Sequence, residues 1–282
     1  MFTWLGVPAM SAAADEARTR AARTYNSAAD VYDDPANTLW ERFGRRTIER
    51  LQLGRGAVIL DVCCGSGASA LSAAEIVGPC GLVLGVDLAE RLLEHARAKA
   101  KGRGLRNVQF RVGDMLDLRI PDDPFDAVVC VFGIFFVPDM PLALRLLWAH
   151  VRSGGKLAIT TWGPRFFEPA TSAFWDSIRK ERPDLYKGFN PWDRICDPPS
   201  LSALFPEAGI ANPAVAAESG RHSISSPEAW WAAVLGSGYR GTVDQLDAVA
   251  RERVRAANFE FIRNSGTTSV EANVVYAVAQ KT

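Results

Sequence analysis

Residues 58–67 have the sequence VILDVCCGSG, and a second apolar run ends in Gly85-Val86-Asp87. The first stretch predicts a buried strand followed by a tight glycine-rich turn that opens onto a helix. The glycines allow a ligand to approach the backbone closely, and the free N–H groups at the helix start attract a negative group. Asp87, at the tip of the next predicted strand, can accept both hydroxyls of a ribose. The sequence therefore predicts a site for a cofactor that contains a nucleoside.

Two kinds of cofactor contain a ribose and suit such a turn. Residues 65–70, GSGASA, match the loose G-x-G-x-x-G/A fingerprint of dinucleotide sites, and Asp87 lies about 20 residues further on, where an acid is expected to bind the ribose of NAD. Asp61 argues against a dinucleotide, because a carboxylate inside an apolar strand is costly unless it is paired, and a dinucleotide turn needs none there. S-adenosylmethionine (SAM) carries an ammonium group that Asp61 can bind, directly or through a water molecule.

A third acid favours SAM. Residues 108–115 contain a short predicted strand that ends near Asp114, and residues 125–132 form a fourth, buried strand. Asp114 is placed to bind the exocyclic amino group of adenine, with Met115 lying against the ring. Acids at the carboxyl ends of successive parallel strands point into one crevice, so we prefer SAM to a dinucleotide.

These motifs resemble the class I SAM-dependent methyltransferases, and within them the small-molecule branch typified by the ubiquinone/menaquinone-biosynthesis C-methyltransferases. The resemblance covers roughly residues 25–161 and rests on LDVCCGSG, GVDLAERLLEHARAKA, VGDMLDL and FDAVVCVFGIFFVPD. It implies an α/β fold: a Rossmann-like, seven-stranded, mostly parallel sheet with its last strand antiparallel, helices on both faces, and a helical lid over the substrate site. Cys63 departs from the family pattern, which has glycine there, and its Cβ is expected to narrow that corner of the pocket.

The resemblance implies SAM as the cofactor and S-adenosylhomocysteine as the product. It also implies that Tyr25 and Tyr32, which precede the first strand, close over the methionine end of SAM and over the acceptor. We assign the cofactor site to Tyr32, Asp61, Cys63, Gly65, Gly67, Asp87, Leu88, Asp114, Met115 and Val131. Because aromatic side chains follow the fourth and fifth predicted strands, we assign the acceptor pocket to Tyr25, Phe132, Phe135, Phe136 and Trp162.

Methyl transfer from a sulfonium is an in-line displacement, in which the protein aligns the reacting groups and excludes water. Residues 131–136 lack the Asn/Asp-Pro-Pro-Tyr/Phe tetrad of enzymes that methylate amide or nucleobase nitrogen, which favours a small, largely apolar acceptor. The sequence names no catalytic base. His222 is the only histidine that we consider for that role, and a structural role for it is the simpler interpretation.

The composition argues against several other classes of function. Lys+Arg and Asp+Glu each number 32, so no overall positive field attracts nucleic acid or an anionic membrane. No apolar run approaches the length of a membrane span. The five cysteines show no C-x-x-C pair, which favours buried thiols over a metal site and leads us to expect a cytoplasmic protein.

We expect residues 1–22 to be a flexible N-terminal segment and residues 23–282 to form the methyltransferase domain, with a lid built from residues 23–45, 164–198 and 226–268. Ser153-Gly154-Gly155 is expected to stop a helix over 141–151 before a fifth strand at 156–161. Residues 214–225 should form a sixth strand, bent near Gly220, and 274–279 the last, antiparallel strand. Further helices are expected over 38–53, 66–76, 88–101, 166–178, 200–207, 227–235 and 242–264.

The leading hypothesis is a SAM-dependent methyltransferase that acts on an O or C atom of a small organic acceptor, for which a quinone-like or secondary-metabolite compound is a candidate. Two alternatives stay open: an NAD(P)-dependent oxidoreductase with the same glycine-rich turn, and a protein that binds SAM without catalysis. Asp61 and Asp114 argue against the first, and the intact motifs argue against the second. The sequence does not specify the acceptor, and it leaves a homodimer open.

Overall fold

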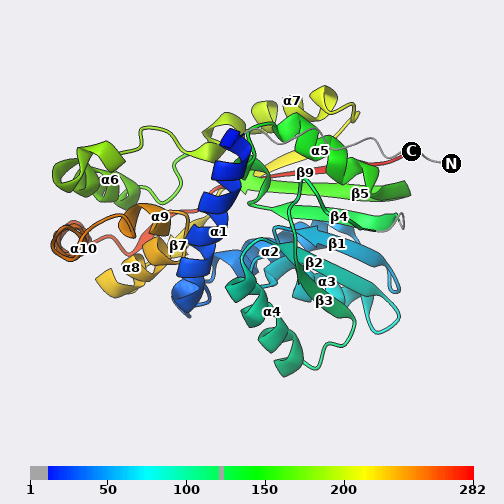
Figure 1. Ribbon diagram of the computed structural model, residues 1–282, viewed down its shortest axis with the longest axis horizontal. Helices are drawn as coiled ribbons and strands as arrows, with labels where there is room; N and C mark the ends of the chain where they lie inside the picture. Colours follow the sequence, from blue (N-terminus) through cyan, green and yellow to red (C-terminus); the bar gives the residue numbers. More distant parts are fainter. Residues whose placement is uncertain (1–11, 121–123) are drawn as a thin grey trace.

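A seven-stranded sheet with the order β3-β2-β1-β4-β5-β9-β6 forms the centre of the protein (Figure 1). The computed structural model describes residues 12–120 and 124–282. The strands are β1 (Val58–Val62), β2 (Leu82–Asp87), β3 (Val108–Val112), β4 (Phe125–Val131), β5 (Val151–Trp162), β6 (Ala214–Glu218) and β9 (Val274–Gln280). β9 runs antiparallel to both β5 and β6, whereas the pairs among β1 to β5 are parallel. The predicted Rossmann-like sheet with an antiparallel last strand is confirmed.

Helices cover both faces of this sheet. They are α2 (Leu39–Leu51), α3 (Ala68–Val77), α4 (Glu90–Gly102), α5 (Met140–Ala149) and α7 (Pro198–Glu207). Ile59 and Val129 belong to one hydrophobic cluster, with residues of α2 and α3. Leu60 and Val128 belong to a second cluster, with residues of α5 and α7. Successive residues of a strand point to opposite faces, so these almost wholly apolar strands are buried on both sides.

β1 lies where the chain diverges to opposite halves of the sheet. β2 and β3 lie on one side of it, and β4 and β5 lie on the other. In doubly wound sheets a ligand binds at the carboxyl ends of the strands that flank such a switch point. The turns that follow β1, β2, β3 and β4 therefore determine where a cofactor would sit.

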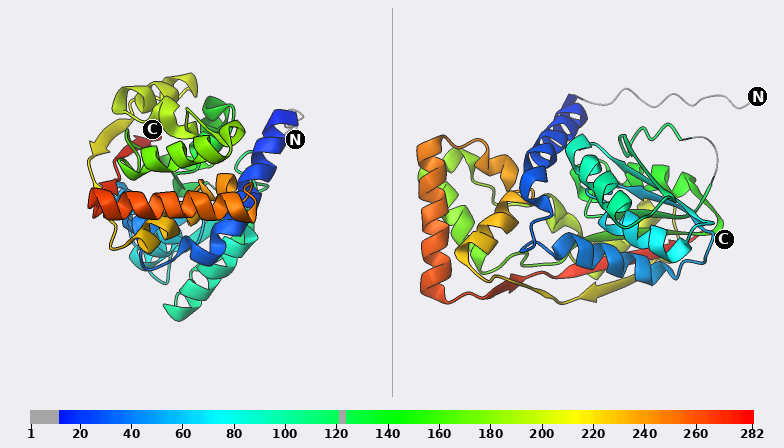
Figure 2. Two further views of the ribbon diagram at one scale, coloured as in Figure 1. Left: turned by 90° about the vertical axis from the view of Figure 1, so that its left-hand side faces the viewer. Right: turned by 90° about the horizontal axis from the view of Figure 1, so that it is seen from below.

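Four helices gather at one end of the molecule, and we call them the cap. They are α6 (Ala170–Glu181), α8 (Pro227–Leu235), α9 (Arg240–Val243) and α10 (Ala248–Ser265). Figures 1 and 2 show the cap beside the α/β core, with α1 (Ala12–Tyr32) standing between the two. A buried polar chain joins three cap helices: Trp230 Nε1 donates to Asn258 Oδ1 at 2.9 Å, and Asn258 Nδ2 donates to Ser177 Oγ at 3.1 Å.

Short elements complete the fold. They are the 3-10 helices η1 (Ile134–Phe136), η2 (Pro183–Leu185) and η3 (Pro191–Ile195), and the two-stranded sheet of β7 (Arg221–Ser223) and β8 (Ser269–Glu271). Within the described parts of the chain, no helix is long and apolar enough to cross a membrane.

The N-terminal region differs from what the sequence predicts. α1 begins at Ala12, inside the segment 1–22 that is predicted to be flexible, whereas residues 1–11 lie outside the described residues. Alanine has the highest helix propensity of all residues, and the stretch from Ala12 is rich in it. The helix therefore begins ten residues before residue 22, where the predicted flexible segment ends.

Two boundaries in the second half of the chain also differ. β5 begins at Val151, so Ser153-Gly154-Gly155 belongs to the strand, and His150 is the C-cap of α5. Gly154 has a φ of 76°, and the register between β4 and β5 shifts nearby, which is typical of a β-bulge. The predicted strand 214–225 is interrupted before Gly220 into β6 and β7, and β7 leaves the main sheet to pair with β8.

Candidate active site

The turn after β1 fixes the carboxylate of Asp87, at the end of β2. Gly65 N donates to Asp87 Oδ2 at 2.8 Å, and Ala89 N donates to Asp87 Oδ1 at 2.8 Å. Burial raises the pKa of Asp87, and these backbone N–H groups oppose the rise. A carboxylate oxygen has two lone pairs, so each oxygen keeps one for a further donor. Asp87 is therefore held in place and still able to accept hydrogen bonds from two hydroxyls.

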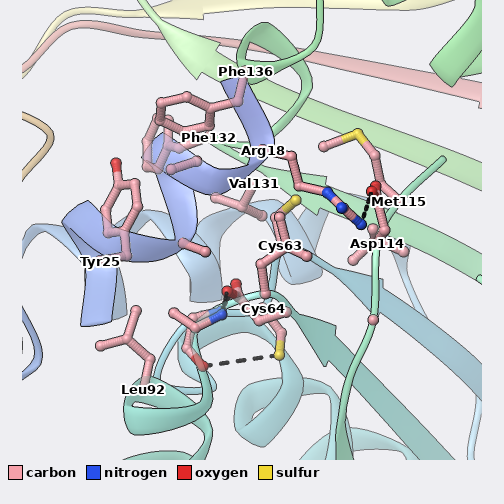
Figure 3. Close-up of a pocket in the computed structure, with 18 of the residues that line it drawn as sticks. Arg18, Tyr25, Cys63, Cys64, Leu92, Asp114, Met115, Val131, Phe132 and Phe136 are labelled. Atoms are coloured by element: carbon pink, nitrogen blue, oxygen red, sulfur yellow. Dashed lines mark hydrogen bonds and ion pairs between the residues drawn. The ribbon is translucent and has the colours of Figure 1, made fainter. Parts of the chain in front are cut away.

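A cavity opens around this carboxylate, at the carboxyl ends of β1 to β4 (Figure 3). The space between its lining residues, open solvent included, is about 1060 Å³. α1, α2 and the segment after β4 form the rest of its wall. Of the predicted site residues, the lining contains Tyr25, Tyr32, Cys63, Gly65, Asp87, Leu88, Asp114, Met115, Val131, Phe132 and Phe136.

Asp114 lies in the cavity with one oxygen unused. Its Oδ1 accepts from Leu116 N at 2.9 Å, whereas its Oδ2 is buried and has no hydrogen-bond partner. The closest cation is Arg18 of α1, whose Nη1 lies 3.8 Å from Oδ2. Figure 3 shows the Arg18 side chain reaching down beside Asp114 and Met115.

Aromatic rings form the part of the wall that α1, α2 and η1 contribute. Tyr32 stacks on Trp40 with ring centroids 4.9 Å apart, and the Tyr32 hydroxyl lies close to Gly65, where a Cβ would be 3.1 Å from it. Tyr25 makes an edge contact with Phe136 at 5.6 Å. This side of the cavity therefore offers flat apolar surfaces and few charges.

The sequence is similar to those of known methyltransferases. Residues 59–155 match the model of a methyltransferase domain. The demethylmenaquinone methyltransferase of Listeria monocytogenes serotype 4b is 30% identical over 184 residues, which are 60% of this chain and 76% of that protein. The chain belongs to the class I SAM-dependent methyltransferases. A second methyltransferase, the demethylmenaquinone methyltransferase of a Geobacillus species, is 37% identical over 111 residues, which are 39% of this chain and 47% of that one.

Solved structures resemble this methyltransferase in fold. The YcgJ protein from Bacillus subtilis has 18% identity and a TM-score of 0.55, over 86% of this chain and 100% of that one. A SAM-dependent methyltransferase from Aquifex aeolicus has 21% identity and a TM-score of 0.52, over 68% and 89% of the two chains. The [4+2]-cyclase SpnF has 21% identity and a TM-score of 0.53, over 86% and 80%. At these identities the likeness concerns the fold alone.

The cofactor of this methyltransferase is SAM, and the residues around the cavity suit it. Asp87 keeps two lone pairs that match the two hydroxyls of a ribose. Asp114 Oδ2 is a buried acceptor without a donor, which an exocyclic amino group would supply. Gly65 and Gly67 have φ values of 53° and 86°, a conformation that glycine adopts without strain. The role of each residue toward SAM stays a prediction.

Asp61 is buried beneath the glycine-rich turn and does not line the cavity. Its Oδ2 accepts from Ser69 Oγ at 2.6 Å, and Ser69 does line the cavity. Burial raises the pKa of Asp61 to about 7, against the opposing effect of the Ser69 hydrogen bond. Asp61 therefore reaches the cavity through Ser69, and we no longer expect a direct contact with the ammonium group of SAM.

Cys63 has a φ of 59°, in the left-handed region that glycine adopts with the least strain. Its thiol is hydrogen-bonded with that of Cys130, and this bond and burial raise the pKa of Cys63. Gly133 lies against it, because a Cβ on Gly133 would be 2.5 Å from the Cβ of Cys63. Cys63 lines the cavity, and that its side chain narrows the cofactor site stays a prediction.

Besides Asp61, four predicted site residues lie outside the cavity lining. Gly67 allows close packing, since a Cβ there would be 3.2 Å from Ala96 and from Phe110. The other three are all buried: Phe135, Trp162 and His222. Trp162 supports the cavity wall from behind, because its ring stacks on Phe132 at 3.7 Å.

His222 lies on β7, outside the cavity, and burial lowers its pKa. Its Nε2 is buried without a hydrogen-bond partner. A general base must come within hydrogen-bond reach of the proton that it removes. We therefore do not propose His222 as the catalytic base.

Several lining residues were not predicted from the sequence. α1 contributes Arg18, Ala21 and Ala22, and α2 contributes Trp40 and Gly44. Trp40 and Gly44 are four residues apart and so lie on one face of α2. A glycine on the apolar face of a helix signals a close approach, and this was the one sequence signal that could have placed α2 at the site. Ser69, Leu92, Leu116, Val137 and Pro138 also line the cavity without having been predicted.

Proposed function

We propose that this methyltransferase moves the methyl group of SAM, by in-line displacement, to an O or C atom of a small and largely apolar acceptor. The observation that supports this most is the composition of the wall formed by α1, α2 and the segment after β4. It presents Tyr25, Trp40, Phe132, Phe136 and Val137. Bound SAM supplies a methyl group on a positively charged sulfur. A dry, apolar wall suits a reaction in which charge disperses, and it excludes water that would compete with the acceptor.

The ionisable groups of the cavity favour an acceptor that is already nucleophilic. Among the described residues, its lining contains no histidine, lysine or glutamate. Burial raises the pKa values of Tyr25 and Tyr32 far above the usual phenol range, so both phenols stay protonated at neutral pH. Asp87 and Asp114 are assigned to the cofactor. We infer that the acceptor brings its own activated atom, such as a phenolate oxygen or the carbon next to one.

The relatives support this class of acceptor. The proteins from Listeria monocytogenes and the Geobacillus species are named demethylmenaquinone methyltransferases. We propose a phenol or a quinol, a small planar molecule, for the present chain. Transfer to carbon and transfer to oxygen both fit the cavity. We also keep as predictions that the lid covers the acceptor, that the protein is cytoplasmic and that it forms a homodimer.

Isothermal titration tests the cofactor site first. We expect S-adenosylhomocysteine and SAM to bind the purified protein at micromolar concentration, and NAD(H) not to bind. Asp87→Ala removes the carboxylate that two hydroxyls would share, so it should abolish binding of the first two. Binding of NAD(H) alone would overturn the proposal.

Methyl transfer to a panel of phenols and quinols tests the acceptor. If the protein supplies no base, the pH at which the rate rises should follow the pKa of each acceptor. One inflection at the same pH for every acceptor would instead show a base on the protein. Binding of SAM without transfer to any of the compounds would favour a protein that binds the cofactor and does not catalyse.

A further inference from the structure

The oxygen of Asp114 that faces the cavity is covered by an arginine. Asp114 Oδ2 has almost no contact with solvent and no hydrogen-bond partner. Arg18 Nη1 lies 3.8 Å from this oxygen, which is an ion pair but too long for a hydrogen bond. Both residues line the cavity. A donor that arrives in the cavity therefore cannot reach Oδ2 until Arg18 moves.

The ion pair between Arg18 and Asp114 is weak enough for another donor to replace Arg18. The Arg18 side chain is 46% exposed, and a half-exposed ion pair of this length stabilises little. Arg18 also has a second anion within reach, because its Nη2 lies 3.3 Å from Asp15 Oδ1 one turn earlier on α1. When Arg18 leaves Asp114, its charge can stay paired with Asp15 and in contact with water.

We propose that Arg18 guards the adenine subsite: the amino group of the cofactor must displace it from Asp114. This proposal rests on the assignment of Asp114 to the adenine of SAM. The exchange replaces a long ion pair with a hydrogen bond to a buried carboxylate oxygen. Tyr25 lies two turns further along the same helix, where α1 lines the acceptor side of the cavity. The exchange therefore also changes the contacts of α1 when the cofactor binds.

Titration of S-adenosylhomocysteine into Arg18→Gln tests the guard. An exposed ion pair contributes up to about 1 kcal/mol, so the variant should bind up to about fivefold more tightly than the natural protein at low salt. Salt weakens the ion pair, so the ratio of the two affinities should approach one between about 50 mM and about 500 mM NaCl. An equal or weaker affinity of Arg18→Gln at low salt would overturn the proposal.

Arg20→Gln is the matched control. Arg20 lies on the same helix, is 67% exposed and pairs with Glu16, so the variant removes the same charge away from the cavity. We expect it to bind S-adenosylhomocysteine like the natural protein. If both variants bind more tightly, the net charge of α1 is responsible and the proposal fails.

A second pair of variants separates this proposal from the assignment of the cofactor site. In an Asp114→Asn background no anion holds Arg18 over the subsite, so Arg18→Gln should no longer increase the affinity. An undiminished increase in that background would overturn the guard. If the natural protein fails to bind S-adenosylhomocysteine at all, the proposed function fails with it. If the natural protein binds and Asp87→Ala abolishes binding, the cofactor site is supported. An affinity of Arg18→Gln equal to that of the natural protein would then overturn only the proposed role of Arg18.

Discussion

The carboxyl group of Asp61 has no contact with water, and burial raises its pKa from 3.8 to about 7. The folded protein therefore holds this proton more tightly than the unfolded chain does. The stabilising contribution of the protonated group is complete below about pH 4 and is lost as the pH rises to about 7. The difference between the two pKa values corresponds to about 4 kcal/mol of unfolding free energy at most.

We predict that Asp61→Asn removes this pH dependence, because asparagine stays neutral and its Oδ1 can still accept from Ser69. Relative to the natural protein, the variant should gain unfolding free energy as the pH rises from about 4 to about 7. Urea unfolding at about pH 5 and about pH 8 measures the difference. Asp117→Asn, which removes a partly exposed carboxylate that pairs with Arg119, is the control. A difference between Asp61→Asn and the natural protein that is the same at both pH values would refute the prediction.

The side chain of Cys63 leaves no room for a Cβ at Gly133. A Cβ on Gly133 would lie 2.5 Å from the Cβ of Cys63, 2.7 Å from its Sγ and 2.8 Å from the Sγ of Cys130. We predict that Gly133→Ala lowers the unfolding free energy by about 2 kcal/mol, a typical cost of overpacking. It should also weaken binding of S-adenosylhomocysteine, because Cys63 is pushed toward the cavity that it lines.

The double variant Gly133→Ala/Cys63→Gly provides the control. Cys63 has a positive φ that suits glycine, and its replacement removes the two shortest contacts of the new methyl group, so that only the contact with Cys130 Sγ is left. Most of the stability and affinity should return. If the double variant is as impaired as Gly133→Ala alone, Cys63 is not the cause of the clash.

From the residues alone, the sequence predicts those cavity-lining residues that follow strand ends, whereas Tyr25 and Tyr32 of α1 were predicted from the family resemblance. Asp87, Asp114 and Met115 follow apolar runs, and parallel strands bring their carboxyl ends to one edge. Arg18 and Trp40 could not be predicted in the same way, because their place at the cavity depends on how α1 and α2 dock on the core. Asp61 was placed in the correct strand, but the alternation of side chains turns it beneath the turn rather than into the cavity.

The packing of α2 on α3 depends on one helical glycine. A Cβ on Gly44 would lie 2.8 Å from Ser69 N and 3.0 Å from the carbonyl carbon of Ala68, both backbone atoms that cannot rotate away. Alanine normally stabilises a helix relative to glycine by about 1 kcal/mol. We predict the opposite sign here: Gly44→Ala should lower the unfolding free energy by about 1–3 kcal/mol and weaken cofactor binding.

Gly102 at the end of α4 is the matched control, because a Cβ there meets nothing within 4 Å. Gly102→Ala should be neutral or slightly stabilising. Thermal unfolding and titration with S-adenosylhomocysteine measure both variants. If Gly44→Ala unfolds at the same temperature as Gly102→Ala, the two helices can separate without cost and the prediction is wrong.

Elements were predicted best where the hydrophobic period is strong. β4 and β9 are short apolar runs bounded by turns, and the structure places both ends of each within one residue of the predicted ends. The predicted helix 242–264 is instead divided into α9 and α10, because the Asp247 side chain accepts from Ala250 N and starts a new helix. Caps of this kind depend on which of several polar residues adopts the extended conformation, and the sequence pattern alone does not select one.

On the scale of the whole molecule, the cofactor residues and the cap belong to different parts. The turns after β1, β2 and β3 carry Asp87 and Asp114, whereas the cap is held by its own buried groups around Asn258. α1 contacts both parts, through α4 on one side and through α8 and α9 on the other. A second connection is a row of ring contacts that leads from Trp230 of α8 through Phe167, Phe166 and Trp162 to Phe132 in the cavity wall. A change inside the cap should therefore reach the cofactor site through α1 or through these rings.

We predict that Asn258→Ala loosens the cap and leaves cofactor binding intact. The substitution deprives the buried Trp230 Nε1 of its acceptor and removes the bond to Ser177, which should cost about 2–3 kcal/mol. Amide hydrogen exchange should accelerate in α6, α8 and α10, while the affinity for S-adenosylhomocysteine changes by less than about twofold, since distant sites are nearly independent. Asn264→Ala, an exposed position on α10, should change neither. A parallel loss of cofactor affinity in Asn258→Ala would show that the cap and the core unfold as one unit. The cap would then have no motion independent of the core with which to admit an acceptor.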